Sequence, residues 1–338
     1  LRIGPMCVAD WMRDELQTER LRAAIAQPAL LGSWMGPWSP GSAANLLIYE
    51  CVADTEVDGG PAALTLALEA AAKAYGVEIR TGSRVDRIRL NSGVVAGVTL
   101  SDGEEIDAPV VASACDPKQT FAKLIGQSAL PIRLYNDIRC IRSRGSTAKL
   151  HLALSGALED STGTPIEVMR TGDTLDELES AYDAVKYHRM SDAPILDVRV
   201  PSMSTPGLAP EGSHTVSVLA HFAPYDLAGG WTEDARKILT DRVIEQLKRF
   251  CPQVEERILA VETLTPADLE SRYGLTHGHI FHGEHAPDQL LFMRPTVQCG
   301  RYSTPIGGLF LCGSGSHPGG GITCAPGALG AQAILRAT

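Results

Sequence analysis

The chain has 338 residues, of which 44% are hydrophobic and 21% are charged, and its formal net charge is −10. This composition excludes a mainly disordered chain, because enough apolar side chains are present to bury a core. The acidic balance argues against a protein that binds nucleic acid through its phosphates. No run of about 18 apolar residues is present, so no transmembrane segment is predicted. The sequence starts at Leu1, without an initiator methionine, and we interpret it as a piece of something larger.

The eight cysteines favour a reducing compartment. They form no Cys-x-x-Cys pair and show no repeated spacing. A disulfide framework is unusual in a chain of this length, so we interpret them as free thiols. Nothing at the N-terminus resembles a signal peptide. We therefore expect a cytoplasmic protein.

Residues 1–58 are predicted to form the helical part of a substrate domain. Apolar residues recur at helical spacing over 8–31, and Pro28 is expected to end or bend that helix. Residues 32–41 form a loop rich in glycine and proline that also holds two tryptophans. The tryptophans indicate a packed corner or, alternatively, the wall of a pocket.

Residues 59–130 have the pattern of the second segment of a nucleotide-binding domain. A helix over 62–75 begins after a proline suited to a first turn, and Gly76 is expected to cap its end. Strands are predicted at 77–80, 84–90, 94–100 and 104–108, followed by a buried strand at 108–114 and a helix at 117–125. The opening βαβ unit of such a domain is missing.

Residues 131–304 differ in character and are predicted to form the main part of the substrate domain, an α+β layer. Strands are predicted at 146–154, 195–200 and 214–223, and helices at 174–185, 232–250 and 252–258. In the helix at 232–250 one apolar stripe is expected to face the core, formed by Ile238, Leu239, Val243, Ile244 and Leu247. The overall fold class is therefore α/β plus α+β.

Residues 305–338 return to the character of a nucleotide-binding domain. A strand at 308–312 leads into a glycine-rich loop, and a helix follows at 325–337. Free backbone N–H groups at such a helix start attract an anionic or electron-rich group. The loop is not a Rossmann fingerprint, because its spacing is Gly-x-Gly-x-x-x-Gly and Pro318 stands where the third glycine belongs. We predict that it covers a flavin bound first by another segment; a structural glycine turn is the alternative.

Several stretches together resemble the phytoene desaturase-like FAD-dependent oxidoreductases. The resemblance covers essentially the whole chain, and within that superfamily it is to the group called pyridine nucleotide-disulfide oxidoreductase domain-containing protein 2. The stretches that carry it are residues 28–47, 59–86, 109–117, 190–194, 222–227, 279–284, 293–295 and 311–327. It implies a glutathione-reductase-type FAD-binding domain, here partial, that is interleaved with a substrate domain built on an antiparallel sheet.

The resemblance also implies where FAD is held. The strand at Arg84 and Val85 would face the adenine, the start of the loop would lie near the pyrophosphate, and its end would bring a helix N-terminus to the flavin pyrimidine edge. The cofactor-binding residues implied are Arg84, Val85, Gly313, Ser314, His317, Gly319, Gly320, Gly321, Ile322 and Thr323. For His317, simple packing of the loop is the alternative.

Members of this superfamily begin with a strand, a Gly-x-Gly-x-x-Gly loop and a helix that bind the ADP half of FAD, and this chain contains none of these. Two explanations compete. Either a second polypeptide supplies that half, or the chain is truncated and inactive. We favour the first explanation and expect a partner subunit.

A cluster of histidines surrounds Glu284 in the sequence, formed by residues 277, 279, 282 and 285. The spacing matches no zinc pattern, so we predict no metal site. His282 and Glu284 are our candidate catalytic residues, placed on the substrate face; a hydrogen-bonded structural turn is the alternative. The sequence thus predicts an oxidoreductase that transfers hydride from a small organic, hydrophobic substrate to FAD, with a non-catalytic scaffold as the competing hypothesis.

Overall fold

The computed structural model describes residues 2–52, 57–205 and 207–338. The chain forms two compact units, and each contains two segments of sequence. The first unit comprises Leu1–Glu78 and Gly145–Asp268, and the second comprises Ile79–Arg144 and Leu269–Thr338. Of the predicted first segment, 1–58, residues 1 and 53–56 lie outside the described residues. Among the described residues, no helix combines the length and the apolar character needed to cross a bilayer.

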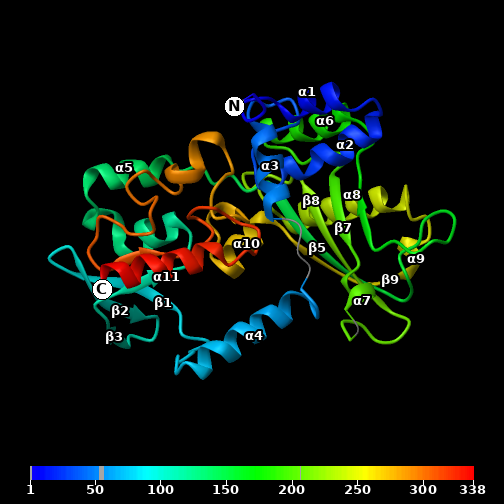
Figure 1. Cartoon of the computed structure of the whole chain (residues 1–338). Coiled ribbons are helices and arrows are strands. Elements are labelled where there is room, and N and C mark those ends of the chain that lie inside the picture. The colour runs from blue at the N-terminus through cyan, green and yellow to red at the C-terminus, as the bar shows by residue number, and fades with distance from the viewer. Residues whose placement is uncertain (1, 53–56, 206) are drawn as a thin grey trace. The chain divides into compact units, whose positions relative to one another are not determined.

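The helical layer of the first unit consists of α1 (Val8–Glu15), α2 (Glu19–Ala26), α3 (Ser42–Val52) and α6 (Leu175–Lys186), shown in Figure 1. The single helix predicted over 8–31 is wrong, because Leu16 is extended and ends α1. Pro28 lies in a short 3₁₀ turn that follows α2. The buried faces of these helices share one apolar core, in which Trp34 is half-buried.

A five-stranded antiparallel sheet lies at the centre of the first unit. Its strands are β5 (Thr147–Leu154), β6 (Val168–Arg170), β7 (Ile195–Arg199), β8 (His214–His221) and β9 (Ile258–Leu264), in the order β6-β7-β8-β5-β9. The predictions of β5, β7 and β8 are confirmed, whereas β6 and β9 were not predicted. In β5, Leu150 and Leu152 face the core, so the residues between them face the other side of the sheet.

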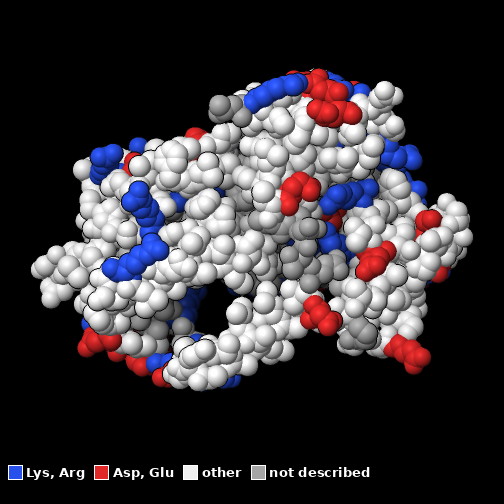
Figure 2. Space-filling view, viewed as in Figure 1, with Lys and Arg blue, Asp and Glu red and all other residues white. Residues whose placement is uncertain are grey.

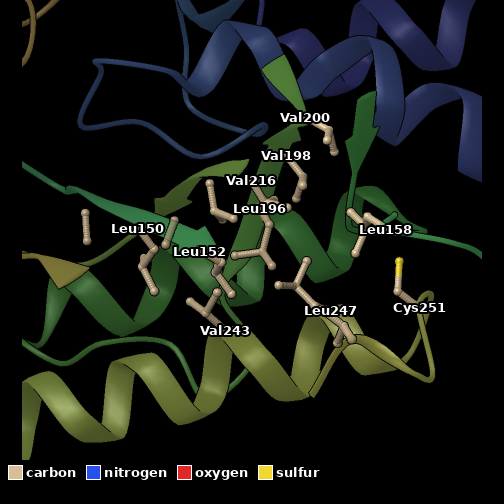
Figure 3. Close-up of a cluster of buried hydrophobic side chains, with 14 of the residues drawn as sticks. Leu150, Leu152, Leu158, Leu196, Val198, Val200, Val216, Val243, Leu247 and Cys251 are labelled. Atoms are coloured by element: carbon tan, nitrogen blue, oxygen red, sulfur yellow. The ribbon is translucent and has the colours of Figure 1, made fainter. Parts of the chain in front are cut away.

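Helix α8 (Glu233–Lys248) covers one face of this sheet. Thr232 caps it by accepting a hydrogen bond from the N–H of Ala235. Figure 3 shows Val243 and Leu247 of α8 among the leucines and valines of the strands. Full burial of each such side chain stabilises the fold by roughly 1.5–3 kcal/mol. One member of the predicted stripe is wrong: Ile238 is 45% exposed, because it lies outside the arc of α8 that meets the sheet. Short helices α7 (Pro201–Ser204) and α9 (Val254–Arg257) complete the unit.

Helix α4 (Gly60–Ala74) has no buried residue. Leu66 and Leu68 on this helix are 65% and 52% exposed. The strand predicted at 77–80 is wrong: these residues are exposed and pair with no strand among the described residues. The described residues therefore leave the apolar side chains of α4, together with Val77 and Ile79 after it, exposed.

The second unit contains two small sheets. Strands β1 (Val85–Asn91), β2 (Val94–Leu100) and β3 (Glu105–Asp107) form an antiparallel meander, as predicted. Strand β4 (Val111–Ser113) pairs in parallel with β10 (Leu309–Leu311), which leads toward α11 (Ala325–Ala337). The strand predicted over 108–114 is thus shorter, and Ala112 in it is exposed, because these two strands form a sheet of their own.

The helices of the second unit include a π-helix at Gln119–Gly126 and α5 (Ile132–Cys140), while α10 (Pro266–Tyr273) spans a boundary between the units. Residues 269–304, which we assigned to the substrate domain, lie in the second unit. They pack there because a buried arginine and a buried aspartate tie them to the glycine loop and to the end of β4, as described next.

Candidate functional site

The glycine-rich loop begins where β10 ends, beside the end of β4. The N–H of Cys312 donates to the carbonyl of Ser113. A Cβ atom at Gly313 would overlap the backbone carbonyl of Ala114, and one at Gly315 would lie 2.5 Å from Cδ of Pro117. The first two glycines are therefore needed so that the loop can leave the strand.

The next glycines pack against the histidine-rich segment. A Cβ atom at Gly319 would lie 2.7 Å from Nε2 of His285, and one at Gly320 would overlap the ring of Phe281. That ring stacks on His285 with centroids 4.6 Å apart. Four of the five loop glycines are thus required by close packing against other residues of the chain. The fifth, Gly321, has a φ of 122° and is exposed. The number of glycines alone does not indicate a cofactor.

Arg294 fastens the two segments together and was not predicted as a site residue. It is 2% exposed, and its guanidinium donates to the carbonyl of Ser314 at 2.9 Å and to that of Phe281 at 2.6 Å. Three more carbonyls accept from it, those of Gly283, Glu284 and Gln289. Burial lowers the pKa of Arg294 to about 10, so it stays charged at neutral pH. An arginine between methionine and proline was the one sequence signal for this role.

Asp116 attaches the same segment to the end of β4. Its carboxylate accepts from the N–H of Thr276 at 3.0 Å and from the hydroxyl of Thr276, and it also caps the N–H of Gln119. Because Asp116 is buried, these bonds fix where the histidine-rich segment begins. The segment is therefore held at both ends.

Glu284, a predicted catalytic residue, is 2% exposed, and both of its carboxylate oxygens accept hydrogen bonds. The guanidinium of Arg144 donates to its two carboxylate oxygens at 2.7 and 2.9 Å, and Arg142 lies 3.4 Å away. Both carboxylate oxygens are thus occupied by hydrogen bonds from Arg144. This arrangement favours a positioning role for Glu284.

His282, the other predicted catalytic residue, lies against Gly315 of the loop. Its Nδ1 is buried and has no hydrogen-bond partner, and the same holds for Nδ1 of His317 within the loop. Burial lowers the pKa of His282, with a smaller effect from Arg294, so its imidazole is neutral at pH 7. Two unsatisfied buried nitrogens beside one loop indicate a place where a ligand group would be accommodated.

The other histidines of the cluster serve local structure. Nδ1 of His279 accepts from the N–H groups of Phe281 and Gly283, and Nδ1 of His277 lies 3.3 Å from the hydroxyl of Ser143. Over the described residues, no three histidine, cysteine or carboxylate side chains converge as metal ligands would.

The end of the loop leads into α11 through two residues with left-handed backbone, Ile322 and Cys324. The Thr323 hydroxyl accepts from the N–H of Ala325, while Ile322 is 75% exposed. The N–H groups of residues 320–323 donate to no acceptor in the described part of the chain. The loop directly before α11 therefore presents free backbone donors that are available to a ligand.

Arg84 and Val85 lie in the second unit, at the start of β1. Strand β1 is an edge of its sheet, and the carbonyl of Arg84 accepts from the N–H of Ser101. An edge strand has backbone groups free on one side. The position is compatible with the predicted adenine contact, but no contact among the described residues joins it to the glycine loop.

The polar face of the sheet in the first unit was missed by the sequence analysis. It is the face opposite α8, and it carries Lys149, His151, Arg170, Asp197, Arg199, Ser217 and His221. Burial lowers the pKa of Lys149 to about 8 and that of His221 to about 4. Perturbed titratable groups of this kind are typical of functional sites. The only sequence signal was polar residues in alternation with buried ones.

Comparison with known proteins identifies the family of the chain. The family described as flavin containing amine oxidoreductase matches residues 16–331. The chain is 34% identical to pyridine nucleotide-disulfide oxidoreductase domain-containing protein 2 of Rattus norvegicus, over 95% of this chain and 59% of that protein. It is 28% identical to a lycopene-forming phytoene desaturase of a Paracoccus species, over 80% of this chain and 52% of that enzyme.

Among solved structures, an oxidoreductase from Methanosarcina mazei superposes with a TM-score of 0.61 at 19% identity, over 98% of this chain and 68% of that one. This likeness shows a shared fold. The chain spans about three fifths of the length of its rat relative. Because the family match covers nearly all of its residues, this chain belongs to the flavin containing amine oxidoreductase family.

Proposed function

We propose that this chain is part of an FAD-dependent oxidoreductase. The observation that carries the proposal is the group of unused N–H donors at residues 320–323, directly before α11. The same loop lies against the two buried nitrogens of His282 and His317 that have no hydrogen-bond partner among the described residues. Free donors at a helix N-terminus suit the electron-rich edge of a flavin. Family membership supports the same cofactor.

In this proposal Gly320, Gly321, Ile322 and Thr323 hold the flavin edge. Bound FAD supplies a ring that accepts hydride from a C–H bond of an organic substrate. The donors of these residues stabilise negative charge at that edge. Gly313, Ser314, His317 and Gly319 line the remaining cofactor chain, and Arg84 with Val85 presents an edge strand to the adenine.

His282 and Glu284 have different roles here. His282 is neutral because burial lowers its pKa, so its Nδ1 accepts a hydrogen bond or a proton from the ligand. Glu284 holds the segment through Arg144 and thereby positions His282. A small organic substrate is proposed, as the family's oxidoreductase chemistry requires.

We further propose that another polypeptide segment, carrying the Gly-x-Gly-x-x-Gly motif, completes the FAD site. The exposed leucines of α4 and the exposed side chains of Val77 and Ile79 support this, because an apolar surface of this kind is normally covered. Figure 2 shows few charges on the visible side of α4, and Glu69 and Lys73 are its only charged residues. A cytoplasmic location is proposed from the free cysteines.

The test is flavin retention. The chain is co-expressed with the part of its rat relative that it does not span, and the purified material is examined for flavin absorbance. Ile322→Asp should lower the flavin content at least tenfold without changing the melting temperature, since Ile322 is 75% exposed. The matched control is Ile132→Asp, at an exposed apolar residue that starts α5. A colourless complex, or equal flavin in Ile322→Asp and the control, contradicts the proposal.

The segment that covers α4 is tested separately. Leu66→Gln with Leu68→Gln should leave the melting temperature of the isolated chain unchanged, because both side chains are exposed. The same double variant should weaken co-purification with the complementing segment. Unchanged co-purification would mean that this segment does not bind α4.

A further inference from the structure

The second unit differs from the first in the sign of its charge. It holds fourteen lysines and arginines against ten aspartates and glutamates, whereas the first unit holds sixteen against thirty. Much of this positive charge comes from residues 118–144, which contain six basic residues and a single acidic one, Asp137. Figure 2 shows more Lys and Arg than Asp and Glu over α5, which lies in this stretch. A surface of this kind attracts a partner of opposite charge.

Two arginines on the outer face of α5 have no acidic partner. Arg133 and Arg139 are exposed, whereas Leu134 and Ile138 on the opposite face are buried. Among the described residues, no carboxylate forms an ion pair with either arginine. Lys123, on the π-helix that packs against α5, is also exposed and has no acidic partner there. Three cations are therefore available to a ligand.

Residues 288–298 lie beside the last turns of α5. The carboxylate of Asp288 pairs with the guanidinium of Arg142, which follows the helix. At the other end, the side-chain amide of Gln298 donates to the carboxylate of Asp137 at 2.6 Å. Asp137 is the single acid of α5, and it bonds this amide rather than an arginine of the helix. Both ends of the segment are thus attached close to the exposed arginines.

Large apolar side chains are exposed in the same area. Between its two attachments, the segment carries Leu291, Phe292 and Val297, each more than half exposed, and the same holds for Ile132 at the start of α5. Leu291 has a left-handed backbone, with a φ of 56°, which is unfavourable for a bulky residue. Apolar side chains held out among cations that lack partners are typical of an interaction surface.

We propose that the basic surface, formed by α5, Lys123 and residues 288–298, binds an acidic segment of a partner protein. Arg133 and Arg139 would pair with carboxylates of that segment. The exposed leucine and phenylalanine beside them would contact its apolar side chains. The inference goes beyond the proposed function and does not depend on a bound flavin.

The side chains of the basic surface favour a protein over a lipid surface as the partner. Arginine and phenylalanine are enriched at protein interfaces. A planar guanidinium matches a carboxylate with two hydrogen bonds, as Arg144 does with Glu284 at 2.7 and 2.9 Å in this chain. A short acidic segment contacts only the basic surface, whereas an anionic membrane would also repel the chain as a whole, whose net charge is −10.

The experiment measures binding of fluorescent peptides to the purified chain by anisotropy. The probe is the acidic peptide Glu-Glu-Leu-Phe-Glu-Glu-Leu-Glu, and its matched control has lysine in place of every glutamate. The wild-type chain should bind the acidic peptide, more weakly as the salt concentration is raised. It should bind the lysine peptide at least tenfold more weakly.

Variants locate the binding surface. Arg133→Gln with Arg139→Gln should weaken binding of the acidic peptide at least tenfold, and Phe292→Ser should also weaken it. All three side chains are exposed, so the melting temperature should not change. The matched control is Arg2→Gln with Arg20→Gln, which removes two exposed arginines of the first unit and should bind the peptide as the wild type does.

The proposal is overturned if the acidic peptide does not bind, if the lysine peptide binds equally well, or if the double variant of α5 binds as tightly as the wild type. Sedimentation with vesicles of phosphatidylcholine and phosphatidylserine, without binding of the peptide, would replace the protein partner by a lipid surface. Loss of peptide binding in the complex with the complementing segment would assign the surface to that segment. A colourless complex contradicts only the proposed function, because peptide binding needs no flavin.

Discussion

Replacing Lys149 with methionine should make the folded chain more stable. Burial lowers the pKa of this lysine from 10.5 to about 8. Because one pKa unit corresponds to about 1.4 kcal/mol, keeping the charged form in the fold costs about 3 kcal/mol at pH 7. Methionine fills similar volume without a charge. It loses the contact to the Ser217 hydroxyl and the attraction of Asp197, which is smaller than the effect of burial on the pKa. We expect Lys149→Met to raise the free energy of unfolding by about 1–3 kcal/mol.

The pH dependence identifies the cause. The folded lysine titrates near 8 and the unfolded one near 10.5, so between these values the unfolded state binds more protons. The stability of the wild type therefore rises with pH across this window, and the advantage of Lys149→Met shrinks over the same range. Urea unfolding at a series of pH values from 7 to 10 measures both trends.

The control is Lys237→Met at an exposed position of α8, which should change the free energy of unfolding by less than about 0.5 kcal/mol. Two results would refute the reasoning: a variant that is less stable than the wild type at pH 7, or a stability difference that does not depend on pH. Confirmation would mean that the chain keeps a lysine that destabilises its fold.

Three further predictions concern the remaining buried groups. Glu284→Gln should lower the free energy of unfolding by about 2 kcal/mol, because it removes the buried carboxylate that Arg144 and Arg142 contact. Asp288→Asn, at the exposed end of the same network, should change it by less than about 0.5 kcal/mol. Equal effects of the two variants would mean that Glu284 does not hold this segment in place. His221→Leu should flatten the loss of stability between pH 6.5 and 4. In this window the histidine of the unfolded chain takes up a proton, whereas the folded imidazole stays neutral down to its pKa of about 4. A slope equal to that of the wild type over this range would contradict the prediction. Gly320→Ala should lower the melting temperature, because the added Cβ would overlap the ring of Phe281. Adding Phe281→Ala should recover part of this loss in a double-mutant cycle. Additive effects of the two substitutions would mean that the two residues are not in contact.

Elements with a strong local signal were predicted well from the sequence. The helix at 325–337 has the predicted bounds, and α8 differs from its prediction by one residue at its start and two at its end. Both have clear starts and apolar periodicity, which are properties of the local sequence. Strand β9 was missed because it follows α9 without a turn residue, and its exposed face weakens the alternation.

The site was predicted less completely, because its key groups depend on tertiary contacts. Lys149 in an alternating strand looks like a solvent-facing residue, and only the register with Leu219 and Leu264 reveals that it is half-buried. Arg294 gave only a weak local signal, because its partners are main-chain carbonyls, which no residue type reveals in the sequence. The loop glycines predicted a cofactor site, yet close packing within the chain is enough to explain four of them.

The kind of hydrogen-bond acceptor that Arg294 uses affects how the sequence of this protein can change in evolution. Every acceptor of its guanidinium in the described part of the chain is a main-chain carbonyl, and none is a side chain. Carbonyls are present whatever residue occupies a position, so substitutions along the histidine-rich segment need not loosen its attachment. Different versions of this protein could therefore vary the side chains beside the glycine loop, and with them the ligand preference, while one arginine keeps the backbone in place.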